Sequence, residues 1–471
     1  MTPQRATPLR SANAPAANEP NVLAAAPFDP AGVAAFVYDS FELDLRVGTL
    51  VCHYRLDDMA FVEHVRFTPA LHADPVAAQR AARLVFLLAG ISYYKAAAPP
   101  RIEFGTHALT EAEAAMLKAF YVDGLGEYGY RNRLDLRDLT FSYQSAAPAP
   151  VPFPVATDQP LVPFGGGIDS IVTVEEVRER HPNTALFVVS RMGDRFAALE
   201  AAAAVTGLSV LRAERELDEK VLRSKALGLR NGHVPVTGIL SAIAVLVAVV
   251  NGRGAVIMSN EWSASSGNLV LDGRSVNHQY SKSADFETLF RGALADSFGG
   301  GPEYFSLLRP FSELAIARRF AELTKYHPAF RSCNRAFPLD TSQRLASWCG
   351  VCDKCCFIDL ILAPFVSASA LARIFDGREP LENPDATTTF RALLDIGPGP
   401  KPFECVGERT ECRAAAQLAH ERSDRRGNVM LAQLVAELGA TQVSPHEISG
   451  LFAPIGVHHI PESYAPRHLL G

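Results

Sequence analysis

A glycine-rich turn between two apolar segments constrains the fold of this chain more than any other feature. Residues 161–174 read Leu-Val-Pro-Phe-Gly-Gly-Gly-Ile-Asp-Ser-Ile-Val-Thr-Val, which predicts a strand, a tight turn at Gly165, Gly166 and Gly167, and the start of a helix. In such a turn backbone N–H groups can converge on phosphate oxygens, and the helix N-terminus adds partial positive charge. Ser170 adds a hydroxyl donor, and Asp169 adds a carboxylate of the kind that Mg²⁺ prefers. The segment therefore predicts a nucleotide-phosphate site.

No lysine ends this loop, so it differs from the GxxxxGK(S/T) loop that holds β and γ phosphates. The segment resembles the SGGxDS PP-loop of ATP pyrophosphatases, which cleave ATP to AMP and pyrophosphate. The alternative is a glycine-rich turn without a ligand, and the flanking strand and helix favour nucleotide binding over it. The resemblance implies ATP and Mg²⁺ as cofactors.

Composition excludes several classes of partner. The formal net charge of −6 over 471 residues gives no broad basic surface, so we expect no nucleic-acid partner. The longest apolar run, Gly238–Val250, is shorter than the ~20 residues that span a bilayer, so we expect no membrane partner. The eight cysteines cluster instead of forming a disulfide scaffold, which indicates metal binding in a reducing compartment. We expect a cytoplasmic enzyme.

Alternation of strands and helices after residue 159 predicts an α/β fold. The expected core is a doubly wound parallel sheet of the PP-loop (adenine nucleotide alpha hydrolase-like) type, with an α+β N-terminal domain and a helical C-terminal region. The N-terminal domain includes a long helix over 77–98. The predicted division is a disordered tail, an N-terminal domain, a linker, a PP-loop domain with the cysteine cluster, and a mostly helical region, at 1–25, 26–144, 145–158, 159–365 and 366–471.

Polar residues follow the ends of the predicted strands. Asp169 and Ser170 follow one strand, and Asn260 and Glu261 follow another, so they should meet at one sheet edge, where doubly wound folds bind ligands. Glu261 could hold Mg²⁺ or act as a base, and Asn260 is a candidate cofactor contact.

Two further segments carry candidates for proton transfer and charge neutralisation. They are Asn231-Gly232-His233 and Val276-Asn277-His278-Gln279-Tyr280-Ser281-Lys282. Arg309-Pro310-Phe311-Ser312-Glu313 is a further polar segment in the same half of the chain. His233 and His278 could shuttle protons, and Lys282 could neutralise a phosphate or carboxylate. Taken singly, each is more readily a surface or capping residue. As a group beside a phosphate loop, about half of them favour a functional role.

The cysteine cluster predicts a tetrahedral metal site. Cys349, Cys352 and Cys355 form a C-x₂-C-x₂-C run, Cys333 lies upstream, and Cys356 is a spare. Four thiolates suit a structural Zn²⁺ that closes all its coordination positions. An Fe–S cluster on three cysteines, a redox relay and free buried thiols remain the alternatives.

Seven separated motifs occur in order along the chain: GGGxDS at 165–170, NGHxPVT at 231–237, SNExSAS at 259–265, VNHQxSK at 276–282, SLLRP at 306–310, WCGVC at 348–352 and KPFECVGE at 401–408. Together they resemble the MurL family of UDP-N-acetylmuramoyl-L-alanyl-L-glutamate epimerases, and the resemblance spans about Tyr93 to Glu408. One departure is Ile168, where the family's loop is expected to have Lys. The resemblance implies ATP- and Mg²⁺-dependent inversion of the terminal L-Glu of UDP-MurNAc-L-Ala-L-Glu to D-Glu for peptidoglycan synthesis, with release of AMP and diphosphate.

The chemistry of a PP-loop suggests a route. Adenylation neutralises the α-carboxylate and makes the neighbouring proton removable, after which a proton returns on the opposite face. Candidate bases are His278, Lys282, His233 and Cys405, and Cys405 would need a lowered pKa.

Other activities stay open. They are an amide ligase, a deazapurine nitrile synthase, a tRNA-modifying enzyme and a non-catalytic nucleotide sensor. The oligomeric state does not follow from the sequence.

Overall fold

The computed structural model describes residues 28–153, 156, 158–271, 273–338, 341–397 and 402–469. The predicted disordered tail, residues 1–25, lies outside these ranges. Among the described helices, none combines the length and the apolar character that a membrane span requires.

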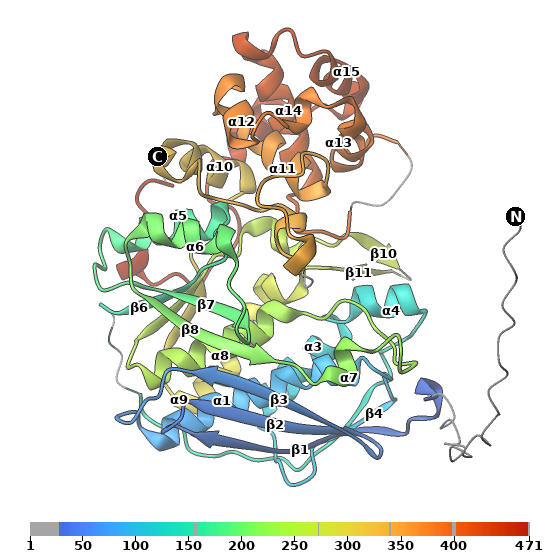
Figure 1. Ribbon diagram of the computed structural model, residues 1–471, viewed down its shortest axis with the longest axis vertical. Helices are drawn as coiled ribbons and strands as arrows, with labels where there is room; N and C mark the ends of the chain where they lie inside the picture. The colour runs from blue at the N-terminus through green and yellow to red at the C-terminus, as the bar shows by residue number, and fades with distance from the viewer. Residues whose placement is uncertain are drawn as a thin grey trace, which may run out of the picture.

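One ten-stranded sheet forms the centre of the molecule (Figure 1), with the strand order β12-β9-β6-β7-β8-β3-β2-β1-β4-β5. Its strands are β1 Ala35–Asp44, β2 Thr49–Leu56, β3 Met59–Phe67, β4 Arg101–Glu103, β5 Thr140–Ser142, β6 Pro160–Pro163, β7 Ala185–Arg191, β8 Val210–Glu216, β9 Ala255–Met258 and β12 Glu303–Ser306. A separate hairpin consists of β10 Leu269–Leu271 and β11 Arg274–Val276.

Five neighbouring strands, β12, β9, β6, β7 and β8, are parallel. From β6 the chain first builds β7 and β8 on one side, and then β9 and β12 on the other. This arrangement confirms the α/β class with a largely parallel sheet. Ligands in such sheets bind beyond the carboxyl ends of the strands at the point where the winding reverses, which here lies between β6 and β9.

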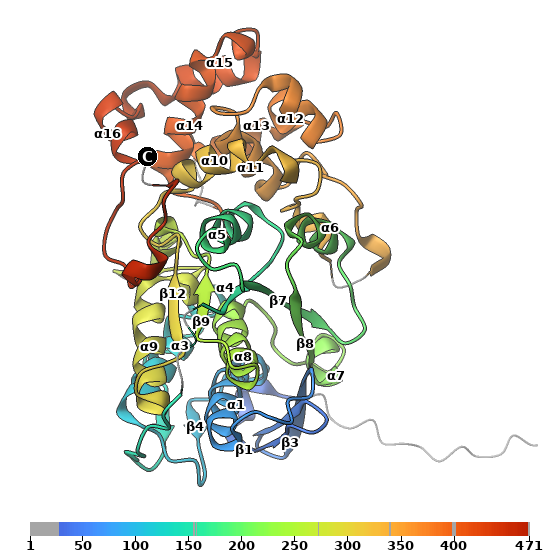
Figure 2. The same cartoon turned by 90° about the vertical axis from the view of Figure 1, so that its left-hand side faces the viewer.

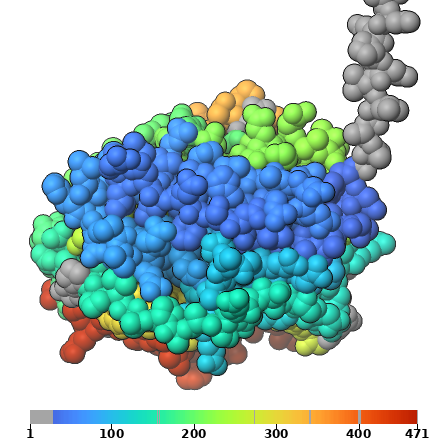
Figure 3. All heavy atoms as spheres, turned by 90° about the horizontal axis from the view of Figure 1, so that it is seen from below, coloured from blue at the N-terminus to red at the C-terminus, as the bar shows by residue number. Residues whose placement is uncertain are grey.

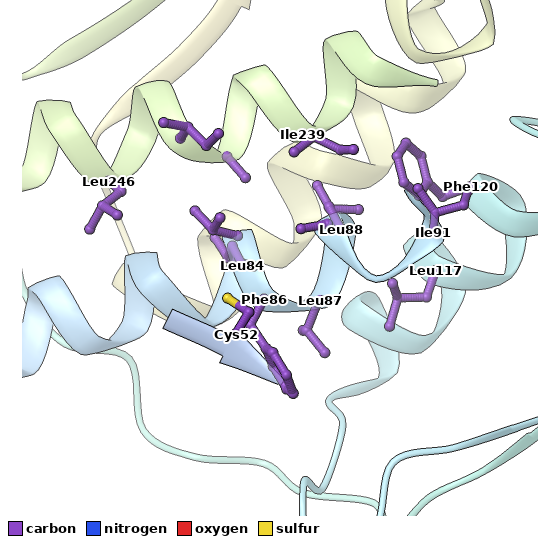
Figure 4. Close-up of a cluster of buried hydrophobic side chains, with 14 of the residues drawn as sticks. Cys52, Leu84, Phe86, Leu87, Leu88, Ile91, Leu117, Phe120, Ile239 and Leu246 are labelled. Carbon is purple, nitrogen blue, oxygen red and sulfur yellow. The ribbon is translucent and has the colours of Figure 1, made fainter. Parts of the chain in front are cut away.

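Helices cover both faces of the parallel strands. The helices are α1 Pro75–Ala89, α2 Ile91–Tyr94, α3 Glu111–Val122, α4 Gly126–Asn132, α5 Ile168–Arg178, α6 Ala197–Thr206, α7 Glu219–Leu222, α8 Val236–Val250, α9 Ala284–Phe298, α10 Glu313–Glu322, α11 Asp353–Leu362, α12 Ala368–Ile374, α13 Thr387–Leu394, α14 Arg409–Glu421, α15 Val429–Leu438 and α16 Pro445–Gly450. Because side chains alternate along a strand, Leu161 joins the core that contains α1 and α8, and Val162 joins the opposite core with α5. Figure 4 shows the first core, where Leu84 and Leu88 of α1 face Ile239 and Leu246 of α8.

The N-terminal strands extend the same sheet. β1, β2 and β3 form an antiparallel meander, and β3 pairs with β8 through Val65 opposite Arg215 and Phe67 opposite Ala213. Seen from below, these strands spread across one face of the molecule (Figure 3). The predicted division into domains stays a prediction, but strands from both sides of the proposed linker belong to one sheet.

The single helix predicted over 77–98 is wrong in its length. It divides at Gly90 into α1 and α2. Glycine is a poor helix former, and at this position a Cβ atom would lie 2.6 Å from the hydroxyl of the buried Tyr38. Packing against the sheet therefore requires glycine where a longer helix would prefer a side chain.

The helices from α11 onward gather at the end of the molecule opposite β1–β3 (Figures 1 and 2). From residue 366 on, the described part of the chain forms helices and loops and contributes no strand. α11 and α14 pack in the second core together with α10.

Candidate active site

The glycine turn after β6 leaves its backbone open. Gly166 has a φ of +74°, in the left-handed region that glycine tolerates, and a Cβ atom at Gly165 would meet no atom within 4 Å. Gly167 is the N-cap of α5, and Ser170 Oγ donates a hydrogen bond to the Gly167 carbonyl at 3.1 Å. The turn and the first amides of α5 thus fit a phosphate group.

Ile168 occupies the core beneath this turn. Its side chain is 2 % exposed and belongs to the same apolar cluster as Val162 and Ile171. The departure from Lys at this position therefore changes the packing under the loop and not its open face.

Three carboxylates meet beside the turn. Asp169 lies in the first turn of α5, Glu261 follows β9, and Glu313 begins α10, and one oxygen of each lies within 4.8 Å of the others. Burial, followed by the charge of Glu261, raises the pKa of Asp169 to about 6, and burial with both neighbours raises the pKa of Glu313 well above its usual value. A divalent cation would offset the repulsion between carboxylates crowded in this way, and an all-oxygen donor set suits Mg²⁺.

Arg309 holds the loops that carry two predicted site residues. Its guanidinium pairs with Glu287 at 3.0 Å and donates to the backbone carbonyls of Glu261 at 2.8 Å and Lys282 at 2.6 Å. Asn260 is buried, and its amide nitrogen donates a hydrogen bond to Ser306 Oγ at 3.0 Å. This side-chain nitrogen is therefore already hydrogen-bonded within the protein. The structure thus brings Asn260 and Glu261 to the predicted sheet edge through a buried polar network.

A thiol centre lies next to the carboxylates. Lys282 Nζ is 3.3 Å from Cys405 Sγ, and Lys354 Nζ donates a hydrogen bond to the Cys405 carbonyl. Burial alone would raise the pKa of Cys405, but Lys282, His278 and Lys354 outweigh it and lower that pKa to about 6. Cys405 is therefore a thiolate at neutral pH, as a catalytic cysteine requires.

The imidazole of His278 has the opposite charge. Burial lowers its pKa, but hydrogen bonds to Cys405 and Glu127, and their charges, outweigh burial and raise the pKa of His278 to about 9. His278 Nδ1 lies 2.5 Å from Glu127 Oε2. The pair Cys405 and His278 thus offers a base and an acid in contact with each other.

His233 has a different character. Its ring lies 4.1 Å from that of His278, centre to centre, and its Nδ1 is 4.0 Å from Glu127 Oε2. Burial and the charge of His278 lower the pKa of His233 to about 4. It is neutral at physiological pH and cannot serve there as a protonated acid.

The four predicted metal ligands converge. One sulfur from each of Cys333, Cys349, Cys352 and Cys355 lies within 4.8 Å of the others, and Cys349 Sγ is 3.7 Å from Cys355 Sγ. Two thiolates at the ~2.3 Å zinc–sulfur distance of a tetrahedral site stand about 3.8 Å apart. The group fits a metal ion of this kind.

The turn of this cluster depends on glycine. Gly350 has a φ of +72°, and a Cβ atom there would lie 2.5 Å from the Arg378 carbonyl. Cys356 is buried outside the set of four sulfurs.

Two residues of this site, Glu127 and Lys354, escaped sequence reasoning. Arg309 and Glu313 belong to the polar segment 309–313, which the sequence indicates without giving either residue a role. Lys354 lies inside the cysteine run, between Cys352 and Cys355, so its position could have signalled it. Glu127 has no such signal, because only the packing of α4 brings it to His278.

The sheet is doubly wound, and a glycine turn, a carboxylate cluster and a thiolate meet at its switch point. This combination is typical of enzymes that bind a small-molecule ligand. Comparison with protein families agrees with this class and makes it specific. The MurL N-terminal domain matches residues 27–307, and the MurL C-terminal domain matches residues 329–448. The chain belongs to the MurL family.

Three relatives share most of their length with this chain. All are named UDP-N-acetyl-alpha-D-muramoyl-L-alanyl-L-glutamate epimerase. The protein of Micromonospora sp. is 40 % identical over 92 % of this chain and 97 % of its own length. That of Salinispora tropica is 38 % identical over 92 % and 94 %, and that of Xanthomonas oryzae pv. oryzae is 36 % identical over 93 % and 98 %.

Proposed function

We propose that this chain is an ATP-dependent epimerase that inverts the terminal L-Glu of UDP-MurNAc-L-Ala-L-Glu to D-Glu through an acyl-adenylate. The observation that carries the proposal is the contact of Cys405 with Lys282 and His278 beside the Asp169 carboxylate group, in a chain whose relatives carry that epimerase name. The reaction would release AMP and diphosphate and serve peptidoglycan synthesis in the cytoplasm.

The first step activates the substrate. An oxygen of the terminal α-carboxylate attacks the α-phosphorus of ATP, and the bond to the β-phosphate oxygen breaks. The amides of the glycine turn and Ser170 would stabilise the departing diphosphate, and Lys282 lies where it can offset the charge of the reacting groups. Asp169, Glu261 and Glu313 would hold Mg²⁺, which supplies electrostatic stabilisation to the phosphates.

The second step inverts the α-carbon. Once the carboxylate is a neutral mixed anhydride, the Cys405 thiolate removes the α-proton, and a proton returns from the opposite face. Inversion requires two groups on opposite sides of the α-carbon, so the substrate would replace the contact between Cys405 and His278. His278 is the donor that its raised pKa favours, and Lys282 is the competing donor. Water then releases AMP and the D-epimer.

In this scheme His233 is neutral, packs its ring against that of His278 and does not donate the proton. The four cysteines would hold a structural Zn²⁺, with Lys354 joining that cluster to the Cys405 backbone. Such a closed site stabilises the fold around the thiolate and does no chemistry itself.

The test incubates the protein with Mg²⁺-ATP and UDP-MurNAc-L-Ala-L-Glu in D₂O. AMP release, glutamate chirality and α-deuteration are followed together. Wild type should form deuterated D-Glu, with AMP only in the presence of the dipeptide substrate. Asp169→Asn should lose AMP formation, whereas Cys405→Ser should lose α-deuteration while it retains substrate-dependent pyrophosphate release. AMP without inversion in wild type, or no AMP at all, would contradict the proposal.

A further inference from the structure

A cavity of about 620 Å³ lies next to the thiol centre and is not used by the reaction steps above. It is formed by α4, the loop that follows α4, and the β10–β11 hairpin. Its size falls in the range of about 300–1,000 Å³ that is typical of small-molecule sites. Its lining includes the aromatic Tyr130 and four arginines, Arg131, Arg133, Arg137 and Arg274.

The charges of this cavity favour a doubly charged anion. Against the four arginines stand two aspartates, Asp123 and Asp135, which leaves a net charge of +2 on the lining. Arg274 pairs with Asp123, and Arg137 pairs with Asp135. Arg133 is exposed, and within the described ranges its side chain has no hydrogen-bond or ion-pair partner. Arginine forks match phosphate oxygens better than any other side chain does.

An aromatic surface completes the site. Tyr130 is 42 % exposed, and Leu271 at the hairpin edge of the cavity is also 42 % exposed. Exposed aromatic rings stack on nucleic bases, and the stacking tolerates any base because each has a π face. Tyr130 also lies 5.9 Å from the ring of Phe403, so its position is fixed from one side.

Three chain segments connect this cavity with the thiol centre. Arg131 of the cavity lies 5.1 Å above the Phe403 ring, and Phe403 precedes Cys405 by two residues, a separation of at most about 7 Å along the backbone. Val276 at the end of β11 lines the cavity and precedes His278 by two residues. Glu127 of α4 contacts His278 and also forms an ion pair with Arg131 of the cavity at 2.6 Å. The cavity therefore lies beside the segments that carry Cys405 and His278.

We propose that this cavity binds the uridine diphosphate end of the sugar-nucleotide substrate. The diphosphate diester carries two negative charges, which match the net charge of the lining, and Tyr130 would contact the uracil. The proposal rests on the proposed function for the identity of the attached sugar peptide, but it assigns a nucleotide diphosphate to this cavity independently of turnover. ATP would bind separately at the glycine turn after β6.

The experiment measures UDP binding by titration calorimetry, without ATP and without turnover. Wild type should bind UDP, and the double variant Arg133→Gln/Arg137→Gln should weaken that binding ~10-fold or more, because each lost fork removes a charge-assisted contact. Tyr130→Ala should weaken it several-fold. The matched control is Arg46→Gln, since Arg46 forms the same exposed pair with an aspartate two residues before it but lies outside the cavity.

Steady-state kinetics gives a second readout. In the double variant the KM for the sugar nucleotide should rise in proportion to the UDP dissociation constant, with the KM for ATP unchanged. UDP should compete with the sugar nucleotide and not with ATP. Undetectable UDP binding to wild type, or wild-type affinity in the double variant and in Tyr130→Ala, would overturn the assignment.

Photolabelling with an azido-uridine diphosphate keeps the question decidable if a variant fails to fold. Labelled peptides within 126–137 or 269–276 of the wild-type chain support the site, and labels elsewhere overturn it. If wild type binds UDP at these peptides but forms no D-Glu, the cavity assignment stands and the proposed function fails.

Discussion

The charge of Cys405 gives the sharpest test of the active-site geometry. The ordinary pKa of a cysteine thiol is 9.0, whereas Lys282, His278 and Lys354 lower that of Cys405 to about 6 against the effect of burial. At pH 7 this change raises the thiolate fraction from about 1 % to about 90 %. Cys405 should therefore react with iodoacetamide at neutral pH far faster than an ordinary thiol.

The perturbation is Lys282→Gln, which removes the ammonium 3.3 Å from the sulfur and leaves His278 and Lys354 in place. The midpoint of alkylation against pH, followed at the Cys405 peptide by mass spectrometry, should lie near pH 6 in wild type and at least about one unit higher in the variant. Lys220→Gln serves as control, since Lys220 pairs with Asp218 and makes no contact with Cys405 in the described structure. A wild-type midpoint near 9, or an unchanged midpoint in Lys282→Gln, would refute the reasoning.

Three further outcomes follow from the site. kcat/KM should rise as pH passes about 6, where the Cys405 thiolate forms, and fall as pH passes about 9, where His278 loses its proton, so a profile without both limbs contradicts the acid–base pair. Cys349→Ser should release about one equivalent of bound metal, measured by plasma emission, and lower Tm by roughly 5 °C or more; full metal content in the variant excludes Cys349 as a ligand. Asp169→Asn should lower AMP formation ~100-fold or more and weaken Mn²⁺ binding measured by electron paramagnetic resonance, whereas unchanged Mn²⁺ affinity removes Asp169 from the cation site.

Local patterns in the sequence predicted the parts of the fold that local physics decides. The run from Leu161 to Val174 encodes its own strand, turn and helix, and the structure places β6, the glycine turn and α5 there. The cysteine spacing likewise indicated that four thiols meet, because three of them lie within seven residues, in the turn at Gly350 and the start of α11. Such features need few contacts from the remainder of the chain.

Tertiary packing decided what the sequence left open. The sequence offered four candidate bases. Only their surroundings distinguish Cys405, whose pKa is lowered, and His278, whose pKa is raised, from His233, which is neutral at pH 7. β12 was not expected, because its four residues gain strand geometry by pairing with β9. The role of Glu127 could not be predicted from the sequence for the same reason, since only the folded chain brings this carboxylate to the imidazole of His278.

The pairing of β3 with β8 has a consequence for how the chain can be divided. A fragment starting at β6 would leave the backbone hydrogen-bonding groups of β8 as an open sheet edge, and α8 would lose the apolar surface of α1 that covers it. Open edges and bare apolar faces promote association between chains. The first third of the protein thus covers the sheet edge and the apolar helix face of the parallel half, and both should unfold in one cooperative transition.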